Sequence, residues 1–211
     1  MMAQLLQTPQ PQSATLIHHV SWQQLEEIDA ALSKFGRFRL AYLDGTLEIM
    51  PVSTDHEDFK KTIAILLEAY MRAAGIRFYG RGGPTLATQE QDARKEPDES
   101  YNIGTRKPHP ELVIEVVFTS GGVDKLEIYR KLGVTEVWFW EDGSLAIYIL
   151  ESFFEDAPLQ NTSIQRYTKV AKSSLLPYLP IETFLRYITY HDQYDAVTEF
   201  LAELQAIADP S

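Results

Sequence analysis

The stretch ELVIEVVFTSGGVDKLEIYRKLGVTEVWFW, residues 111–140, predicts the centre of the fold. Residues 112–118 are apolar except for one glutamate, which is typical of a central strand covered on both faces. A helical pattern over residues 123–132 stops at Gly133, and a second apolar strand follows over residues 136–140. Strand, helix and strand in this order predict a βαβ unit whose two strands pair in parallel.

The flanking sequence adds helices and antiparallel strands to this unit. Ser21 is a predicted N-cap, and Asp44-Gly45 between alternating apolar residues predicts a tight hairpin. Further elements are expected as a helix over 21–34, a helix over 56–75, a strand over 98–103, a strand pair around 142–143, a weak strand over 164–170 and a last helix over 192–207. We therefore expect an α/β (α+β) fold, with a mixed central β-sheet flanked by helices.

Composition limits the domain count and the class of protein. A chain of 211 residues that is 45% hydrophobic suits one core, so we expect a single domain over residues 16–211. The Gln/Pro-rich residues 1–15 are predicted to be disordered. The chain has no cysteine, which excludes disulfides, thiolate nucleophiles and cysteine-ligated metal sites. No stretch is apolar enough to span a membrane, so a soluble, cytoplasmic protein is expected.

The formal charge of −11 argues against a protein that coats nucleic acid. It does not exclude a nuclease, because acids gathered around a metal raise the negative count. Six cations either form a local basic patch that faces a substrate or are ordinary solvated surface residues. They are Lys60, Lys61, Arg72, Arg77, Arg81 and Arg94.

Glu115 lies inside the apolar strand, where an ionised carboxylate requires a cation, hydrogen-bond donors or a metal. Asp98 lies on a different predicted strand that is a candidate neighbour of the first. Two carboxylates in one cleft would suit Mg²⁺ or Mn²⁺. Lys125 lies on the first turn of the following helix. Its positive charge would favour the hydroxide form of a metal-bound water, or neutralise the negative charge that develops on a phosphate.

Three segments carry a family resemblance: HEDFKKTIAILL, EPDESYNIG and PELVIEVVFTSGGVDKLEIYRKLGVTEVWFWEDG. Their order and spacing resemble the Uma2 family of restriction-endonuclease-like proteins, a domain abundant in cyanobacteria, over about residues 20–190. The resemblance implies a PD-(D/E)xK nuclease core and DNA as substrate. In that core Asp98 and Glu115 resemble the metal-binding acids and Lys125 the lysine, while Glu57 falls where related nucleases carry an additional metal-binding acid.

The sequence also departs from the general nuclease pattern. The lysine usually comes two residues after the second acid, where this chain has Val117, so Lys125 would be a migrated substitute. The Pro-Ser-Thr segment of many members is replaced here by residues 118–122.

Each candidate has an ordinary structural alternative. Glu115 is compatible with a buried acid that is paired with an internal Lys or Arg. Asp98 is compatible with a turn residue after proline, and Lys125 with an exposed lysine on a helix. His56 and Glu57 fit the beginning of a helix.

A metal-dependent DNA endonuclease is therefore the first functional hypothesis. Its rivals are a catalytically silent binding or interaction module with a nuclease fold, and a nuclease that needs a partner protein to bind DNA. A homodimer is compatible with the sequence. If a metal balances the two acids, Asp98→Asn and Glu115→Gln should abolish cleavage without lowering the melting temperature.

Overall fold

The computed structural model describes residues 14–36, 38–51, 54–118, 122–157, 160–190 and 192–208. Of the segment 1–15 that was predicted to be disordered, only residues 14 and 15 lie in this range, and Thr15 begins the first strand. None of the helices in the described ranges is long and apolar enough to cross a membrane.

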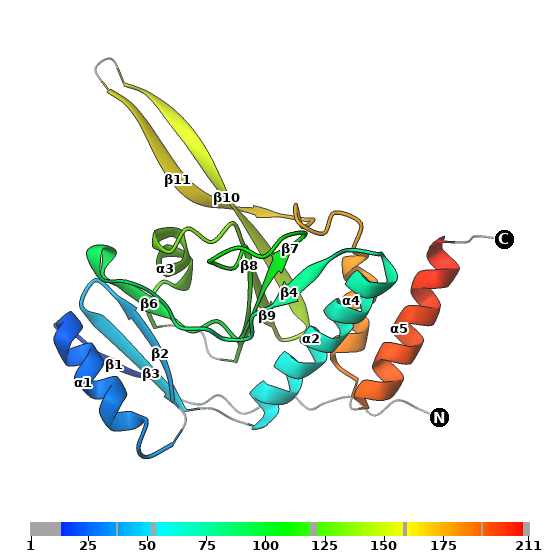
Figure 1. The fold of residues 1–211 in the computed structure, drawn as a ribbon, viewed down its shortest axis with the longest axis horizontal. Helices are drawn as coiled ribbons and strands as arrows, with labels where there is room; N and C mark the ends of the chain where they lie inside the picture. The colour runs from blue at the N-terminus through cyan, green and yellow to red at the C-terminus, as the bar shows by residue number, and fades with distance from the viewer. Residues whose placement is uncertain are drawn as a thin grey trace.

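The described strands form two sheets (Figure 1). The first has the order β1-β3-β2-β6-β5 and is antiparallel throughout. It contains β1 (Thr15–Ile17), β2 (Phe38–Leu43), β3 (Thr46–Pro51), β5 (Leu86–Thr88) and β6 (Ala93–Lys95). Helix α1 (Trp22–Leu32) covers one face of this sheet through Leu25, which packs with Leu40, Tyr42 and Leu47.

The second sheet has the order β11-β10-β9-β8-β7-β4. Only β8 and β9 pair in parallel, so this sheet is mixed. It contains β4 (Phe78–Gly80), β7 (Glu99–Ile103), β8 (Leu112–Val117), β9 (Glu136–Glu141), β10 (Ser144–Ala157) and β11 (Gln160–Val170). A short 3-10 helix, η1 (Gln89–Gln91), joins β5 to β6.

Helices cover both faces of the mixed sheet. Ile114 and Val116 face a core shared with α2 (Thr54–Ala73), α4 (Ile181–Ile188) and α5 (Gln193–Ala208). Val113 faces the other side, where Tyr129 of α3 (Lys125–Lys131) packs against it. The alternation of side chains along a strand explains this division. The architecture is α+β, and the predicted βαβ unit is confirmed as β8-α3-β9.

The local signals read from the sequence also hold. Ser21 caps α1 and forms a capping box with Gln24. Asp44 and Gly45 both have positive φ, 45° and 80°, as a primed hairpin turn requires.

Three features differ from the sequence-based expectation. There are two sheets instead of one mixed sheet. Strand β10 continues far beyond its pairing with β9 and forms, with β11, a two-stranded arm that projects from the body (Figure 1). Helix α4 lies between the expected strand over residues 164–170 and the expected last helix, where no helix was predicted. Pro180 is its N-cap and does not interrupt it.

Candidate active site

Asp98 and Glu115 lie opposite each other on adjoining segments of the mixed sheet. Asp98 directly precedes β7, and Glu115 is the fourth residue of β8. Since Glu99 pairs with Ile114 in this antiparallel ladder, Asp98 comes next to Glu115. Their exposed fractions are only 1% and 2%. The structure thus brings together the two acids that the sequence singled out.

Asp98 is surrounded by groups that favour its charged form. The guanidinium of Arg39 contacts its Oδ1, His56 Nε2 lies 3.0 Å from its Oδ2, and the backbone N–H of Val116 donates to Oδ2 at 2.6 Å. Burial alone would raise the pKa of Asp98, but the hydrogen bond and charge of His56, with the charges of Arg39 and Lys95, hold it well below its usual range. The carboxyl group is therefore ionised.

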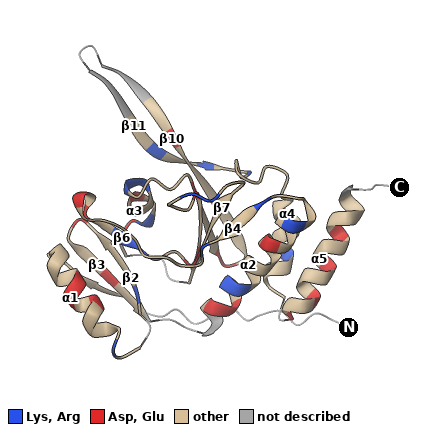
Figure 2. Ribbon diagram, in the orientation of Figure 1, with Lys and Arg blue, Asp and Glu red and all other residues tan. Residues whose placement is uncertain are grey.

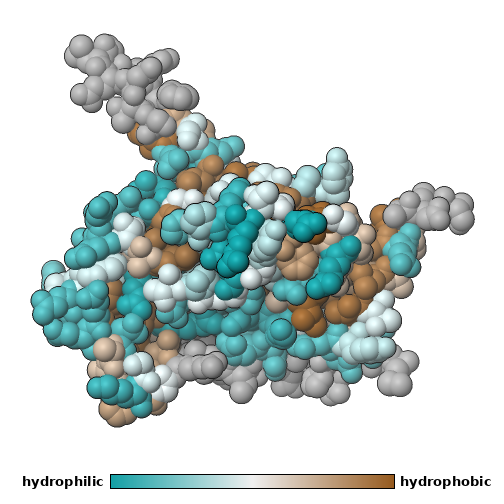
Figure 3. Space-filling view, viewed as in Figure 1, coloured by the Kyte–Doolittle hydropathy of each residue, from teal (hydrophilic) through white to brown (hydrophobic). Residues whose placement is uncertain are grey.

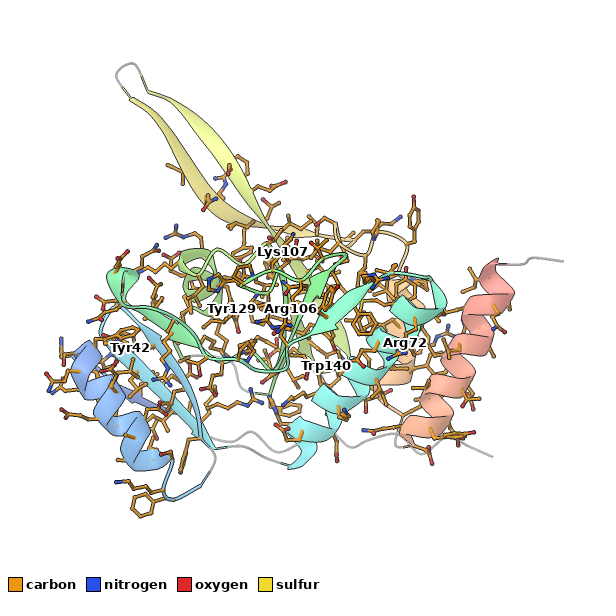
Figure 4. All side chains as sticks on the ribbon, in the orientation of Figure 1. Tyr42, Arg72, Arg106, Lys107, Tyr129 and Trp140 are labelled. Carbon is orange, nitrogen blue, oxygen red and sulfur yellow. The ribbon has the colours of Figure 1, made fainter. Side chains whose placement is uncertain are left out.

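Glu115 has its own set of partners. Lys95 Nζ lies 3.0 Å from Glu115 Oε2, and the hydroxyl of Tyr129 donates to Oε1. Lys95 is itself 1% exposed and also donates to the carbonyl of Glu96 at 3.0 Å. Burial raises the pKa of Tyr129, and the neighbouring Glu115 raises it further, so the hydroxyl keeps its proton. Figure 4 shows Tyr129 in the middle of the molecule.

The cations come from the other sheet. Ala41 of β2 pairs with Lys95 of β6, and Arg39 lies two residues before Ala41 in the same strand. Residues two apart in a strand, and residues paired across strands, point to the same face. This face of the five-stranded sheet therefore presents Arg39 and Lys95 to the acids of the mixed sheet.

A third buried acid lies on the same face. Glu48 of β3 pairs with Ala41 and is 1% exposed. Its Oε2 accepts from the backbone N–H of Val123 at 3.3 Å, and Gly122 lies so close to the carboxylate that a Cβ atom there would collide with it. Glu48 thus holds the residues that lead into α3.

Of the other two predicted site residues, Lys125 lies apart from this cluster of contacts, whereas Glu57 is joined to it through Arg39. Lys125 is the first residue of α3 and is half-buried; within the described ranges it makes no hydrogen bond or ion pair. Glu57, in the first turns of α2, is 3.2 Å from both Arg39 and Lys60. Burial opposes its ionisation, but Lys60 and Arg39 lower the pKa of Glu57. Arg39 bridges Glu57 and Asp98.

An open cleft of about 480 Å³ leads to Arg39. It lies between α1, β2, the beginning of α2 and the residues that precede Asp98. Arg39, Glu57 and Lys60 form one side of it, and Glu96 and Pro97 form another. Solvent and a substrate thus have access to the arginine that holds Asp98.

The donor chemistry of the acid pair suits a hard divalent cation. Both residues supply carboxylate oxygens, although Oδ1 of Asp98 is in contact with the guanidinium of Arg39. No group of three or more acid or histidine side chains among the described residues is arranged to hold an ion. Mg²⁺ is commonly held by one or two carboxylates, with water and substrate phosphates as further ligands. Asp98 and Glu115 are the residues that fit this role, whereas Glu57 would first have to leave Arg39 and Lys60.

Sequence reasoning missed Arg39, Lys95 and Glu48. The alternation in residues 38–43 places Leu40 and Tyr42 toward α1, and it marks the face of Arg39 as the wet side of a hairpin. The contact of that face with the second sheet buries it instead. Lys95 carries one weak signal, since it lies two residues after Ala93, on the same face of the strand, and precedes Asp98 by three residues.

Comparison with known proteins then decides the family. A family model described as "Putative restriction endonuclease", Uma2, matches residues 22–180. The chain belongs to the Uma2 family. A search of curated proteins found no match. The Uma2 match includes every residue of the site described above, and the α+β architecture is that of a restriction-endonuclease-like domain. The resemblance noted in the sequence is thereby confirmed.

Proposed function

We propose that this Uma2 protein hydrolyses phosphodiester bonds in DNA with Mg²⁺ or Mn²⁺ held by Asp98 and Glu115. The observation that carries the proposal is the pair of buried carboxylates on adjoining β-segments, beside a cleft open to solvent. Membership of a family of restriction-endonuclease-like proteins supports it.

The protein's own groups would divide the work as follows. A bound divalent ion lowers the pKa of a water molecule and stabilises negative charge on phosphate oxygens. Lys95, fixed by Glu115 and the carbonyl of Glu96, keeps a positive charge beside the acid pair. Arg39 lines the cleft and is suited to bind a phosphate oxygen. We therefore favour Lys95 over Lys125 as the lysine that acts beside the two metal-binding acids.

One observation favours the rival function, a catalytically silent module with a nuclease fold. Arg39 contacts Asp98, and Lys95 contacts Glu115, so protein cations already compensate both charges. A metal ion is not needed to explain why these carboxylates are buried. In a silent module the four groups would be a structural ion-pair network between the two sheets.

Metal binding and cleavage separate the two functions. Mn²⁺ is titrated calorimetrically into the wild type, Asp98→Asn and Glu127→Gln, and the same proteins are incubated with supercoiled DNA and Mn²⁺. We expect binding and nicking in the wild type and in Glu127→Gln, whose surface ion pair with Arg130 lies on α3, and neither in Asp98→Asn. A wild type that takes up no Mn²⁺ at millimolar concentration would identify the silent module.

Substitution of the two lysines tests which of them serves the acids. In Lys95→Met the competing cation at Glu115 is gone, so Mn²⁺ should bind about tenfold more tightly, or about 1.4 kcal/mol, while cleavage falls. Lys125→Met should leave both properties near the wild-type values. If Lys125→Met lost cleavage while Lys95→Met cleaved DNA like the wild type, Lys125 would be the lysine that serves the acid pair.

A further inference from the structure

A cluster of exposed cations lies at the edge of the mixed sheet, at the far end of β7 from Asp98. It consists of Arg72 near the end of α2, Arg77 just before β4, and Arg106 and Lys107 in the loop after β7. All four side chains are exposed. We call these four residues the cationic edge. Figure 4 labels Arg72, Arg106 and Lys107, and Figure 2 shows basic segments around β4 and β7 in the same view.

Backbone and ring contacts show that these residues are neighbours. The N–H of Gly104 donates to the carbonyl of Arg77 at 2.7 Å, which places the beginning of β4 beside the loop that carries Arg106. The guanidinium of Arg72 lies 6.0 Å from the ring centre of Phe78, the residue after Arg77. The backbone positions that carry the four charges therefore lie along one edge of the mixed sheet. Figure 3 shows strongly hydrophilic residues across the middle of this face.

Three of the four charges are not compensated. Within the described residues, Arg72, Arg77 and Arg106 make no ion pair, and Lys107 alone pairs with an acid, Glu111. In a chain with a net charge of −11, such a group stands out. By contrast Arg94, a member of the basic patch considered from the sequence, lies on β6 and contacts Asp29 at 2.5 Å.

The loop of the cationic edge is held rigidly from beneath. Arg81 donates to the carbonyl of Lys107 at 2.8 Å and to Asn102 Oδ1 at 3.0 Å. The amide of Asn102, a residue with no exposed surface, donates to the carbonyl of His109 at 2.7 Å, and the N–H of Lys107 donates back to Asn102 Oδ1 at 3.2 Å. The buried side chains thus fix the backbone that presents Arg106 and Lys107, and binding there costs little ordering of the loop.

The cationic edge lies at a useful distance from the acid pair. Gly104 lies six positions after Asp98, at the other end of β7, which corresponds to about 20 Å in a strand. Along B-DNA this length is about six base pairs. We propose that the cationic edge binds the phosphate backbone of duplex DNA on the order of six base pairs from the bond placed at Asp98 and Glu115. This inference rests on the proposed function for the choice of DNA, but not on catalysis.

Binding measured without metal tests the inference separately from cleavage. Fluorescence anisotropy with a labelled duplex, in EDTA and over a series of salt concentrations, is recorded for the wild type and for Arg72→Gln/Arg77→Gln/Arg106→Gln. The matched control is Lys34→Gln/Lys169→Gln/Lys172→Gln, which removes three exposed charges from other parts of the surface.

We expect the edge variant to bind at least about tenfold more weakly at low salt, with a salt slope shallower by about 2 to 3. The control should stay close to the wild type, and all three proteins should melt at similar temperatures. Equal losses in both variants, or a wild type that does not bind the duplex at low salt, would overturn the inference. A protein that binds DNA through this edge but cuts none would retain the inference and refute the proposed nuclease activity.

Discussion

At the scale of single residues, the two acids are balanced by protein cations. Arg39 and Lys95 contact Asp98 and Glu115, and Tyr129 and the backbone of Val116 donate to the remaining oxygens. This arrangement changes what a substitution does. From the sequence we expected that neutralising either acid would relieve repulsion and leave the melting temperature unchanged. In the structure each acid has a cationic partner, half-buried Arg39 for Asp98 and fully buried Lys95 for Glu115, so removal of Glu115 leaves an uncompensated buried charge.

Glu115→Gln should therefore destabilise the protein. It leaves the Lys95 ammonium buried without an anion, and breaking a buried pair in this way costs about 3–5 kcal/mol. Urea denaturation of the wild type and the variant measures the change in the free energy of unfolding.

Two further variants make this measurement specific. Glu115→Gln combined with Lys95→Met should recover most of the loss, because no unpaired charge remains. Glu127→Gln, which breaks a partly exposed pair with Arg130 within one helix, should cost no more than about 1 kcal/mol. Equal costs for the buried and the exposed substitution would contradict the assigned role of Lys95.

At the scale of elements, Glu136 joins β9 to the segment before α4. It has no exposed surface, and its Oε1 accepts from Trp138 Nε1 at 2.6 Å. Its Oε2 accepts from the N–H and the hydroxyl of Ser174 at 2.9 and 2.7 Å, and from the N–H of Leu175 at 3.3 Å. The carboxylate is satisfied entirely by neutral donors. It fixes the chain that leads to Leu176 and Leu179 in the core.

Glu136→Gln should loosen this segment. An amide has one acceptor oxygen, so part of the donor set loses its partner, at a cost of about 1–3 kcal/mol. Hydrogen exchange of the amides of residues 174–176 should become faster, whereas Glu141→Gln, at the exposed end of β9, should leave it unchanged. Unaltered exchange in Glu136→Gln would show that the segment is held by the apolar core alone.

At the scale of the whole molecule, the charge contacts join two sheets. The five-stranded sheet supplies Arg39 and Lys95, and the mixed sheet supplies Asp98 and Glu115. Since His56 and these cations lower the pKa of Asp98 in the folded protein, its titration is coupled to the folding of both sheets.

Acid should weaken the fold through Asp98. The pKa of this carboxyl is lower in the folded than in the unfolded chain, where it is near 3.8. The stabilisation is therefore complete above about pH 3.8 and is lost as the pH falls from there through the folded-state pKa. The free energy of unfolding of Asp98→Asn should depend less steeply on pH in this range than that of the wild type. Parallel curves for the two proteins would show that the pKa of Asp98 is not lowered by folding.

The sequence by itself determined the local elements and the pair of acids. Periodicity, caps and the Asp-Gly turns predicted α1, α2, the β2-β3 hairpin and the β8-α3-β9 unit, because these signals depend on residues close together in the chain. A carboxylate inside an apolar strand marked Glu115, because burial of a charge requires compensation. Only the tertiary structure decided what compensates it. Arg39 and Lys95 reach the acids because the two sheets pack against each other. Contacts between strands that are far apart in the chain produce no periodic pattern in the sequence. For the same reason Lys125, chosen for its nearness in sequence, lies outside the contacts of the acid pair, whereas Lys95 makes one.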